Sequence, residues 1–252
     1  MNQTLKNSLK RLKLSGLLVT LDVRIQEATA NQLNPMEFLE LLMQDEIALR
    51  DDRAIQRRIK AARFRDQKRI EDFDFSFNPS IPRRDIMNFT AGSFIREKRD
   101  ILFLGPPGVG KSHLAQGIGV QAAKMGFTVL YRSIFDACSE LQEAETFQEK
   151  SKMLQRYLKP ELLIIDDMGL KVLPNKAGEH LFEIIMRRYE MRSTIMTSNR
   201  PLEEWGKLVG DVPTATAILD RFLSRAHLIQ IKGKSYRLKN AGKNAKKETS
   251  SK

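Results

Sequence analysis

The chain has little of several features that mark other classes of protein. Cysteine occurs once, at Cys138, which excludes an internal disulfide framework and is typical of a reducing compartment. No apolar run reaches the roughly 18 residues that a membrane span requires. The opening segment, MNQTLKNSLKRLKL, lacks the apolar core of a secretory signal. Together these absences predict a cytoplasmic protein with no membrane span, and no membrane is among its expected partners.

Negative charge is scarce relative to positive charge. The 43 lysines and arginines outnumber the 31 aspartates and glutamates, which gives a net charge of +12 and a pI near 9.8. Such an excess of positive charge fits a polyanionic partner, and nucleic acid is a better candidate than an acidic membrane surface. The alternative is a basic surface that contacts only solvent. Within residues 57–69, seven cations face a single acid, Asp66. They are Arg57, Arg58, Lys60, Arg63, Arg65, Lys68 and Arg69.

Apolar periodicity predicts a helical N-terminal domain over residues 1–72. The leucines of the first 30 residues have the spacing of short amphipathic helices, broken near Ser15-Gly16. Asn34-Pro35 then predicts a helix start, with asparagine as the cap and proline at the first helical position. The helical period continues to about residue 70. Residues 73–98 begin with FDFSFNPSIPRRD, whose alternating aromatics and two prolines indicate a linker and the entry to a second domain.

Residues 99–238 alternate short apolar strands with helices. Apolar strands separated by helices imply an α/β fold with a parallel sheet covered on both faces. The lysine-rich tail, residues 239–252, has almost no apolar residues and is expected to be disordered. The predicted strands are residues 101–105, 127–132, 161–167, 193–199 and 227–233, and the predicted helices are 111–125, 133–158 (one or two helices), 176–191 and 214–226.

A phosphate-binding loop follows the first predicted strand. Residues 105–112 read GPPGVGKS and match G-x-x-x-x-G-K-[ST] at every required position. The glycines let backbone N–H groups face phosphate oxygens, Lys111 can reach the β- and γ-phosphates, and the Ser112 hydroxyl is placed to bind Mg²⁺. The loop therefore predicts binding of ATP with Mg²⁺. The predicted nucleotide-binding residues are Gly105, Pro106, Pro107, Gly108, Val109, Gly110, Lys111, Ser112 and His113, the last expected on the helix surface and not as a catalyst.

A second strand, LLIIDD, ends in two carboxylates, Asp166 and Asp167. Carboxylates at the end of a central parallel strand lie beside the phosphate loop in such sheets. Asp166 is therefore predicted to hold Mg²⁺ through water, beside Ser112, and Asp167 to polarise the attacking water.

Further along the chain, polar and basic residues follow in an informative order. The strand STIMTSN ends in Thr197, Ser198 and Asn199, polar side chains placed where they could sense a γ-phosphate and its attacking water. Arg221 and Arg225 end a helix just before the last strand, and Arg237 follows that strand. The order of phosphate loop, acidic strand, polar sensor and arginines resembles that of the AAA+ ATPases.

Within that class, the stretches FDFSFNPSI, LLIIDDMG, TSNRPLEEW, AILDRF and KGKSYRL are similar to the IstB-type transposition helper ATPases, relatives of the DnaC helicase loaders. The resemblance covers nearly the whole chain. It implies a bacterial insertion-sequence protein that oligomerises on DNA with ATP and directs a transposase to its target. It also implies that Asn199 is the sensor, Arg221 the finger for a neighbouring subunit's ATP, with Arg225 as the alternative, and Arg237 the second sensor.

One departure concerns the acidic strand, which in many AAA+ proteins ends in Asp-Glu and here ends in Asp-Asp. The shorter Asp167 predicts slow hydrolysis and a timer-like role. The expected partners are double-stranded DNA bound with low sequence specificity, a cognate transposase and other copies of the chain. Two alternatives stay open: a helicase loader that binds single-stranded DNA, and a small-molecule kinase, for which an inter-subunit arginine would have no use.

Overall fold

The computed structural model describes residues 2–174 and 176–238, and the chain divides between Arg57 and Arg58 into two compact units. The smaller unit contains α1 (Gln3–Arg11), α2 (Ser15–Ala30) and the first part of α3 (Pro35–Ala62). Its apolar side chains form one small buried cluster, made of Leu9, Leu17, Leu21 and Leu42.

A buried carboxylate connects α2 to α3 within the smaller unit. Glu46 accepts hydrogen bonds from the backbone N–H groups of Gly16, at 2.5 Å, and Leu17, at 3.4 Å. These N–H groups lie in the first turn of α2, where they have no helical partner and favour a negative charge. Arg50 neutralises the same carboxylate at 2.7 Å. The break between the first two helices thus falls near Ser15-Gly16, as predicted.

The start of α3 is confirmed, but its predicted end is wrong. Asn34 accepts from the N–H groups of Met36 and Glu37 and donates its own N–H to the Glu37 carboxylate, which is a capping box. The helix ends at Ala62 and not near residue 70, because Arg63 takes a left-handed conformation with φ of 57°. The residues that follow pack along α6 (Lys111–Lys124) in place of continuing the helix.

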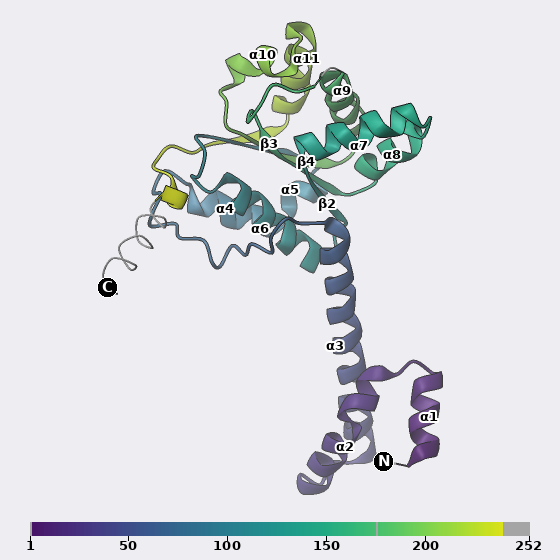
Figure 1. The fold of residues 1–252 in the computed structure, drawn as a ribbon. Helices are drawn as coiled ribbons and strands as arrows, with labels where there is room; N and C mark the ends of the chain where they lie inside the picture. Colours follow the sequence, from purple (N-terminus) through teal and green to yellow (C-terminus); the bar gives the residue numbers. More distant parts are fainter. Residues whose placement is uncertain (1, 175, 239–252) are drawn as a thin grey trace, which may run out of the picture. The chain divides into compact units, whose positions relative to one another are not determined.

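The larger unit is built on a five-stranded parallel sheet, which confirms the predicted α/β class (Figure 1). The strand order is β2-β3-β4-β1-β5, so the strand that precedes the phosphate loop, β1, is flanked by β4 and β5. All four pairings are parallel. The strands are β1 (Asp100–Leu104), β2 (Val129–Ser133), β3 (Leu162–Met168), β4 (Ser193–Ser198) and β5 (Ala226–Gln230).

Helices cover both faces of the sheet, as predicted (Figure 1). Successive strand side chains point to opposite faces, and those of Leu102, Leu104 and Met196 join the larger core cluster with the helices that follow β2 and β3. On the other face Ile164 lies against Gly119 of α6, and α4 (Arg83–Thr90) packs on α6. The remaining helices are α5 (Ser93–Arg96), α7 (Ile134–Thr146), α8 (Lys150–Leu158), α9 (Ala177–Arg188), η1 (Leu202–Glu204), α10 (Trp205–Val209) and α11 (Val212–Leu223).

The compact units divide the chain earlier than the domains proposed from the sequence, 1–72, 73–98 and 99–238. Residues 58–98 group with the sheet in the larger unit, and the segment 73–98 includes α4 and α5. The basic tail, residues 239–252, lies outside the described residues. Among the helices of the described ranges, none combines the length and the apolar character needed to cross a membrane.

Candidate nucleotide-binding site

The phosphate loop connects the end of β1 to the start of α6, as the sequence predicted. Its glycines are required by geometry at two positions in particular. Gly108 and Gly110 have φ of 82° and 107°, a region that side chains disfavour. A Cβ at Gly110 would lie 2.7 Å from the Phe73 ring, and one at Gly108 would lie 2.1 Å from the hydroxyl of Ser235. The segments that carry Phe73 and Ser235, which are distant from the loop in sequence, thus pack closely against it.

Lys111 is turned back onto the loop. Its Nζ donates to the carbonyl oxygens of Gly105, at 2.7 Å, and Pro106, at 2.8 Å. Burial lowers the pKa of Lys111 to about 8, while the carboxylates of Asp166 and Asp167 act in the opposite direction. The ammonium is therefore a buried cation with only weak neutral acceptors, and a phosphate would be a much stronger partner.

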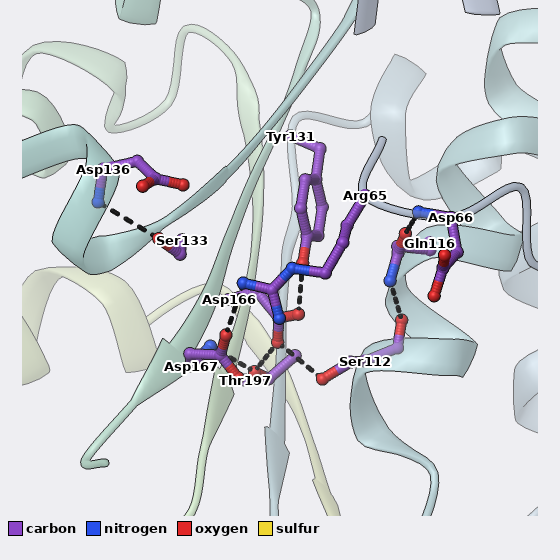
Figure 2. Close-up of polar contacts among 10 residues, drawn as sticks. All are labelled: Arg65, Asp66, Ser112, Gln116, Tyr131, Ser133, Asp136, Asp166, Asp167 and Thr197. Carbon is purple, nitrogen blue, oxygen red and sulfur yellow. Dashed lines mark hydrogen bonds and ion pairs between the residues drawn. The ribbon is translucent and has the colours of Figure 1, made fainter. Parts of the chain in front are cut away.

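Three hydroxyl groups donate hydrogen bonds to the Asp166 carboxylate (Figure 2). Its Oδ1 accepts from the Ser112 hydroxyl at 2.9 Å and from the Thr197 hydroxyl. Its Oδ2 accepts from the Tyr131 hydroxyl at 2.6 Å. These donors come from α6, β4 and β2, so the carboxylate at the end of β3 is held by both neighbouring strands and by the loop helix. The sequence had predicted Ser112 as a companion and had placed Thr197 near the γ-phosphate, but it had not predicted Tyr131.

The oxygen donors at this point fit a magnesium ion. Ser112 and Asp166 are paired directly and both present hard oxygen ligands, and Mg²⁺ is usually held by one or two protein groups together with substrate phosphates and water. Within the described part of the chain, no group of three or more histidine, cysteine or acidic side chains is placed to hold a metal by itself. The donor set is therefore suited to a metal that enters with a nucleotide.

Asp167 projects from an irregularity in β3. The pairing of β3 with β4 shifts between Ile165 and Met168, which is a bulge of the kind that redirects a side chain. Asp167 itself has φ of 65°. Its N–H donates to the Thr197 hydroxyl at 3.2 Å, and its Oδ2 lies 3.2 Å from the guanidinium of Arg65 (Figure 2). Burial and the neighbouring Asp166 charge raise the pKa of Asp167, whereas Arg65 lowers it.

These groups surround a cavity of about 500 Å³, a size typical of small-ligand sites. Asn199 and Arg237 line it, together with the loop from Pro107 to His113. Gly105 and Pro106 contribute through the carbonyls that hold Lys111. His113 lies at the start of α6 with its Nε2 2.7 Å from the carbonyl oxygen of Arg69.

Aromatic side chains form another wall of the cavity, and two of them, Phe73 and Phe77, come from the segment that the sequence predicted to be a linker. Phe73, Phe77 and Tyr236 line it, and the rings of Phe77 and Tyr236 meet edge to face with centroids 5.0 Å apart. Flat apolar rings are suited to stack on a planar base. The alternating aromatics of residues 73–77 were the signal that could have located this wall.

The two candidate finger arginines do not line the cavity of their own chain within the described residues. Arg225 is engaged by the carboxylate of Glu190 at 3.2 Å and by a backbone carbonyl at 3.3 Å. Arg221 is exposed and lies over the Tyr189 ring, 5.6 Å from its centroid.

Comparison with known proteins agrees with this geometry. The family model described as IstB-like ATP binding protein matches residues 7–244. A protein named as ATP-binding in insertion sequence IS5376 of Geobacillus stearothermophilus is 40% identical over 230 residues, which are 91% of each chain. Its counterpart in insertion sequence IS21 of Pseudomonas aeruginosa is 36% identical over 235 residues, 93% of this chain and 89% of that one.

Solved structures place the fold in the AAA+ class. The DnaC helicase loader matches with a TM-score of 0.52 and 25% identity, over 59% of this chain and 87% of that one. AMPPCP-bound DnaA from Aquifex aeolicus matches with a TM-score of 0.57 and 20% identity, over 73% and 56% of the two chains. With its phosphate loop, its acidic strand and these relatives, the chain belongs to the family of IstB-like ATP-binding proteins and has the AAA+ P-loop fold.

Proposed function

We propose that this protein is a magnesium-dependent ATPase whose ATP-bound form oligomerises on duplex DNA and delivers that DNA to a transposase. One observation carries the enzymatic part: Lys111, Ser112 and the two carboxylates at the end of β3 meet at a single cavity. Phosphoryl transfer requires a cation for the phosphates, ligands for the metal and an acidic group for the attacking water, and this cavity contains all three.

Each group of the cavity has a defined task in this proposal. Lys111 leaves the loop carbonyls for the β- and γ-phosphates. Ser112 and Asp166 would hold Mg²⁺, which supplies charge neutralisation on the phosphate oxygens when bound. Asp167 polarises the attacking water, and Asn199 orients it. Arg237, which lines the cavity, contacts the chain's own nucleotide.

Slow hydrolysis follows from the length of the Asp167 side chain, which is one methylene shorter than the glutamate common at this position. A carboxylate that lies farther from the attacking water is a weaker water-activating group. We therefore expect a low rate of ATP hydrolysis, which suits a protein that times the release of its complex better than one that moves along DNA.

Arg221 is the arginine that we assign to a neighbouring subunit's ATP. It is exposed and lies over the Tyr189 ring, whereas Arg225 is engaged by a carboxylate and a carbonyl. An arginine supplied in trans stabilises charge on the transferring phosphoryl group. Hydrolysis would then depend on assembly, which links the ATPase cycle to the oligomer.

Duplex DNA is proposed as the polyanion that matches the net charge of +12. Within residues 57–69, the candidate segment, three cations already have partners. Arg58 donates to the carbonyl of Ala123 at 2.8 Å, Arg65 pairs with Asp167, and Lys68 lies 3.6 Å from the Asp66 carboxylate. The exposed candidates are Arg57, Lys60, Arg63, Lys68 and Arg69. Contacts of this kind bind phosphates and therefore carry little sequence information.

The transposition role rests on the relatives. Proteins similar over nine-tenths of the chain are named as ATP-binding proteins of insertion sequences. A mobile element needs an enzyme that joins its ends to a target, so an accompanying ATPase with affinity for DNA is suited to choosing that target. Such a protein would act in the bacterial cytoplasm, where the target DNA lies.

Sedimentation of the purified protein with a short duplex or with single-stranded DNA, each with and without ATP and Mg²⁺, tests this function. Large complexes that form only with ATP and duplex DNA are the expected result. Assembly that ignores ATP would contradict the proposal, even if the protein still hydrolysed ATP.

The second candidate is a helicase loader, which the match to the DnaC helicase loader favours. A helicase loader has the same ATPase core. The two functions therefore differ only in the protein partner and in whether the bound DNA is single- or double-stranded. ATP-dependent complexes restricted to single strands, together with co-purification of a hexameric helicase, would select it.

A further inference from the structure

Arg65 occupies an unexpected position for a residue that follows the long helix α3. Its guanidinium enters the nucleotide cavity and lies 3.2 Å from Oδ2 of Asp167 (Figure 2). In the sequence it belongs to the basic run of residues 57–69, the segment proposed to contact DNA. In the structure it is instead a basic side chain of the nucleotide cavity.

The segment that carries Arg65, residues 63–73, is fitted onto α6 and is here called the strap. The N–H of Asp66 donates to the Gln116 side chain at 3.1 Å, and Gln116 in turn donates to the carbonyl of Ser112 at 3.3 Å. The carbonyl of Arg69 lies 2.7 Å from the His113 ring. Two bonds therefore anchor the strap to the first turns of the helix that begins in the phosphate loop.

Two glycines of α6 make room for the strap. A Cβ on Gly117 would lie 2.6 Å from Ile70, and one on Gly119 would lie 2.9 Å from the Phe64 ring. Phe64 also packs near the Tyr131 ring, with centroids 6.2 Å apart. Packing and hydrogen bonds thus fix the backbone on each side of Arg65. The fixed backbone places the Arg65 side chain at the cavity.

The side chain of Arg65, unlike its backbone, retains freedom. It is 56% exposed, against 18% for Asp167, and one ion pair at 3.2 Å connects the two. A half-exposed pair of this kind is weak. A γ-phosphate entering the same cavity would offer the guanidinium a more highly charged, bidentate partner, which arginine prefers.

We propose that Arg65 is the residue by which this site distinguishes ATP from ADP, exchanging its pairing with Asp167 for the γ-phosphate. This inference rests on the proposed function, since it concerns the same nucleotide cavity. With ADP, or with no nucleotide, Arg65 stays on Asp167 and occupies one of its oxygens. With ATP, the exchange releases that oxygen for the attacking water.

The test compares Arg65→Ala and Arg65→Lys with a matched control, Arg69→Ala, in the full chain. Arg69 is also an exposed cation of the strap, but it is not among the described residues that line the cavity, and its backbone bond to His113 survives the change. Affinities for ADP and for an ATP analogue with a methylene between the β- and γ-phosphates are measured with Mg²⁺ and without DNA.

For Arg65→Ala we expect about a tenfold weaker affinity for the analogue and less than about a twofold change for ADP, the effect of losing one charge-assisted contact. Arg65→Lys should fall between this variant and the unchanged protein, and Arg69→Ala should keep the original ratio. In steady-state hydrolysis, Arg65→Ala should raise KM while kcat changes less than about threefold, because a contact made equally in ground and transition states affects binding alone.

An unchanged ratio of the two affinities in Arg65→Ala would overturn the inference, and so would an equal loss of ATP affinity in Arg69→Ala. Failure of the unchanged protein to bind either nucleotide would instead overturn the proposed function. The two failures are therefore distinguishable in one set of measurements.

Discussion

The Tyr131 hydroxyl, on β2, donates a hydrogen bond of 2.6 Å to Oδ2 of Asp166, at the end of β3. Burial raises the pKa of Tyr131, and the neighbouring Asp166 charge adds to that rise, so the phenol remains a donor over the working pH range. The bond occupies one carboxylate oxygen and directs the other toward Ser112. Tyr131 is thus an orienting partner for the proposed magnesium ligand.

Tyr131→Phe should raise the Mg²⁺ concentration that hydrolysis requires, without disturbing the fold. Loss of an outer partner of a metal ligand typically costs about 10- to 100-fold in metal affinity or activity. The measurement is ATPase rate as a function of Mg²⁺ concentration, with circular dichroism as the check on folding. An unchanged Mg²⁺ requirement would show that Asp166 is oriented without Tyr131.

Lys111→Ala should abolish the stabilisation of the protein by ATP. A ligand that binds only the folded state raises stability by about 2.7 kcal/mol at a hundred times its Kd, and this increment should disappear together with the principal phosphate cation. Thermal unfolding with and without ATP and Mg²⁺ measures it. Lys124→Ala, at the other end of α6, is the control and should retain the full shift; a normal shift in Lys111→Ala would contradict the site.

Asp167→Asn should separate nucleotide binding from hydrolysis. Asparagine tolerates the left-handed conformation that this position adopts, with φ of 65°, so the variant should fold normally. Without the carboxylate that polarises water, turnover should fall by about 10²–10⁴, the usual contribution of such a group, while ATP affinity persists. Equilibrium binding and single-turnover hydrolysis together provide the comparison, and turnover near that of the unchanged protein would remove Asp167 from the mechanism.

Arg221→Ala should bind ATP but hydrolyse it slowly in the assembled state, by about 10³-fold or more if the arginine acts in trans. Arg225→Ala should instead cost about 0–1 kcal/mol of stability, because it loses a partly exposed ion pair, and should keep its activity. Mixing Arg221→Ala with Asp167→Asn subunits is the sharper measurement. Mixed interfaces then contain one intact Asp167 opposite one intact Arg221, so activity should reappear; no recovery would argue against a finger supplied by a neighbour.

Asp100, buried at the start of β1, should make stability depend on pH. Burial raises its pKa to about 7, although its Oδ1 accepts the N–H of Thr194 at 2.6 Å. Because the folded state holds this proton more tightly than the unfolded chain, the stabilisation is complete below the unfolded pKa of about 4 and is lost as the pH rises through about 7. Urea unfolding at pH 5 and pH 8 measures this loss in the free energy of unfolding, which is on the order of a few kcal/mol. Asp100→Asn should abolish the difference between the two pH values. An equal pH dependence in both proteins would place the titration elsewhere.

The phosphate loop and its acidic partner could be predicted from the sequence because their information is local. Consecutive residues supply the N–H groups, Lys111 and Ser112, and an apolar run with two terminal acids marks the end of a central strand. Asn199 and Arg237 line the predicted cavity for a similar reason, since each follows a strand whose end lies at the same edge of the sheet. Their roles, like those of Arg221 and the DNA-contacting cations, stay predictions.

The tertiary structure alone decided which distant side chains complete the site. Tyr131 and Thr197 reach Asp166 because β2 and β4 are the two neighbours of β3, an order that no local pattern specifies. Arg65 reaches Asp167 because α3 stops at Ala62 and the strap packs on α6. Helical periodicity favoured continuing that helix, but packing against glycines outweighed intrinsic propensity, which contributes only tenths of a kcal/mol per residue.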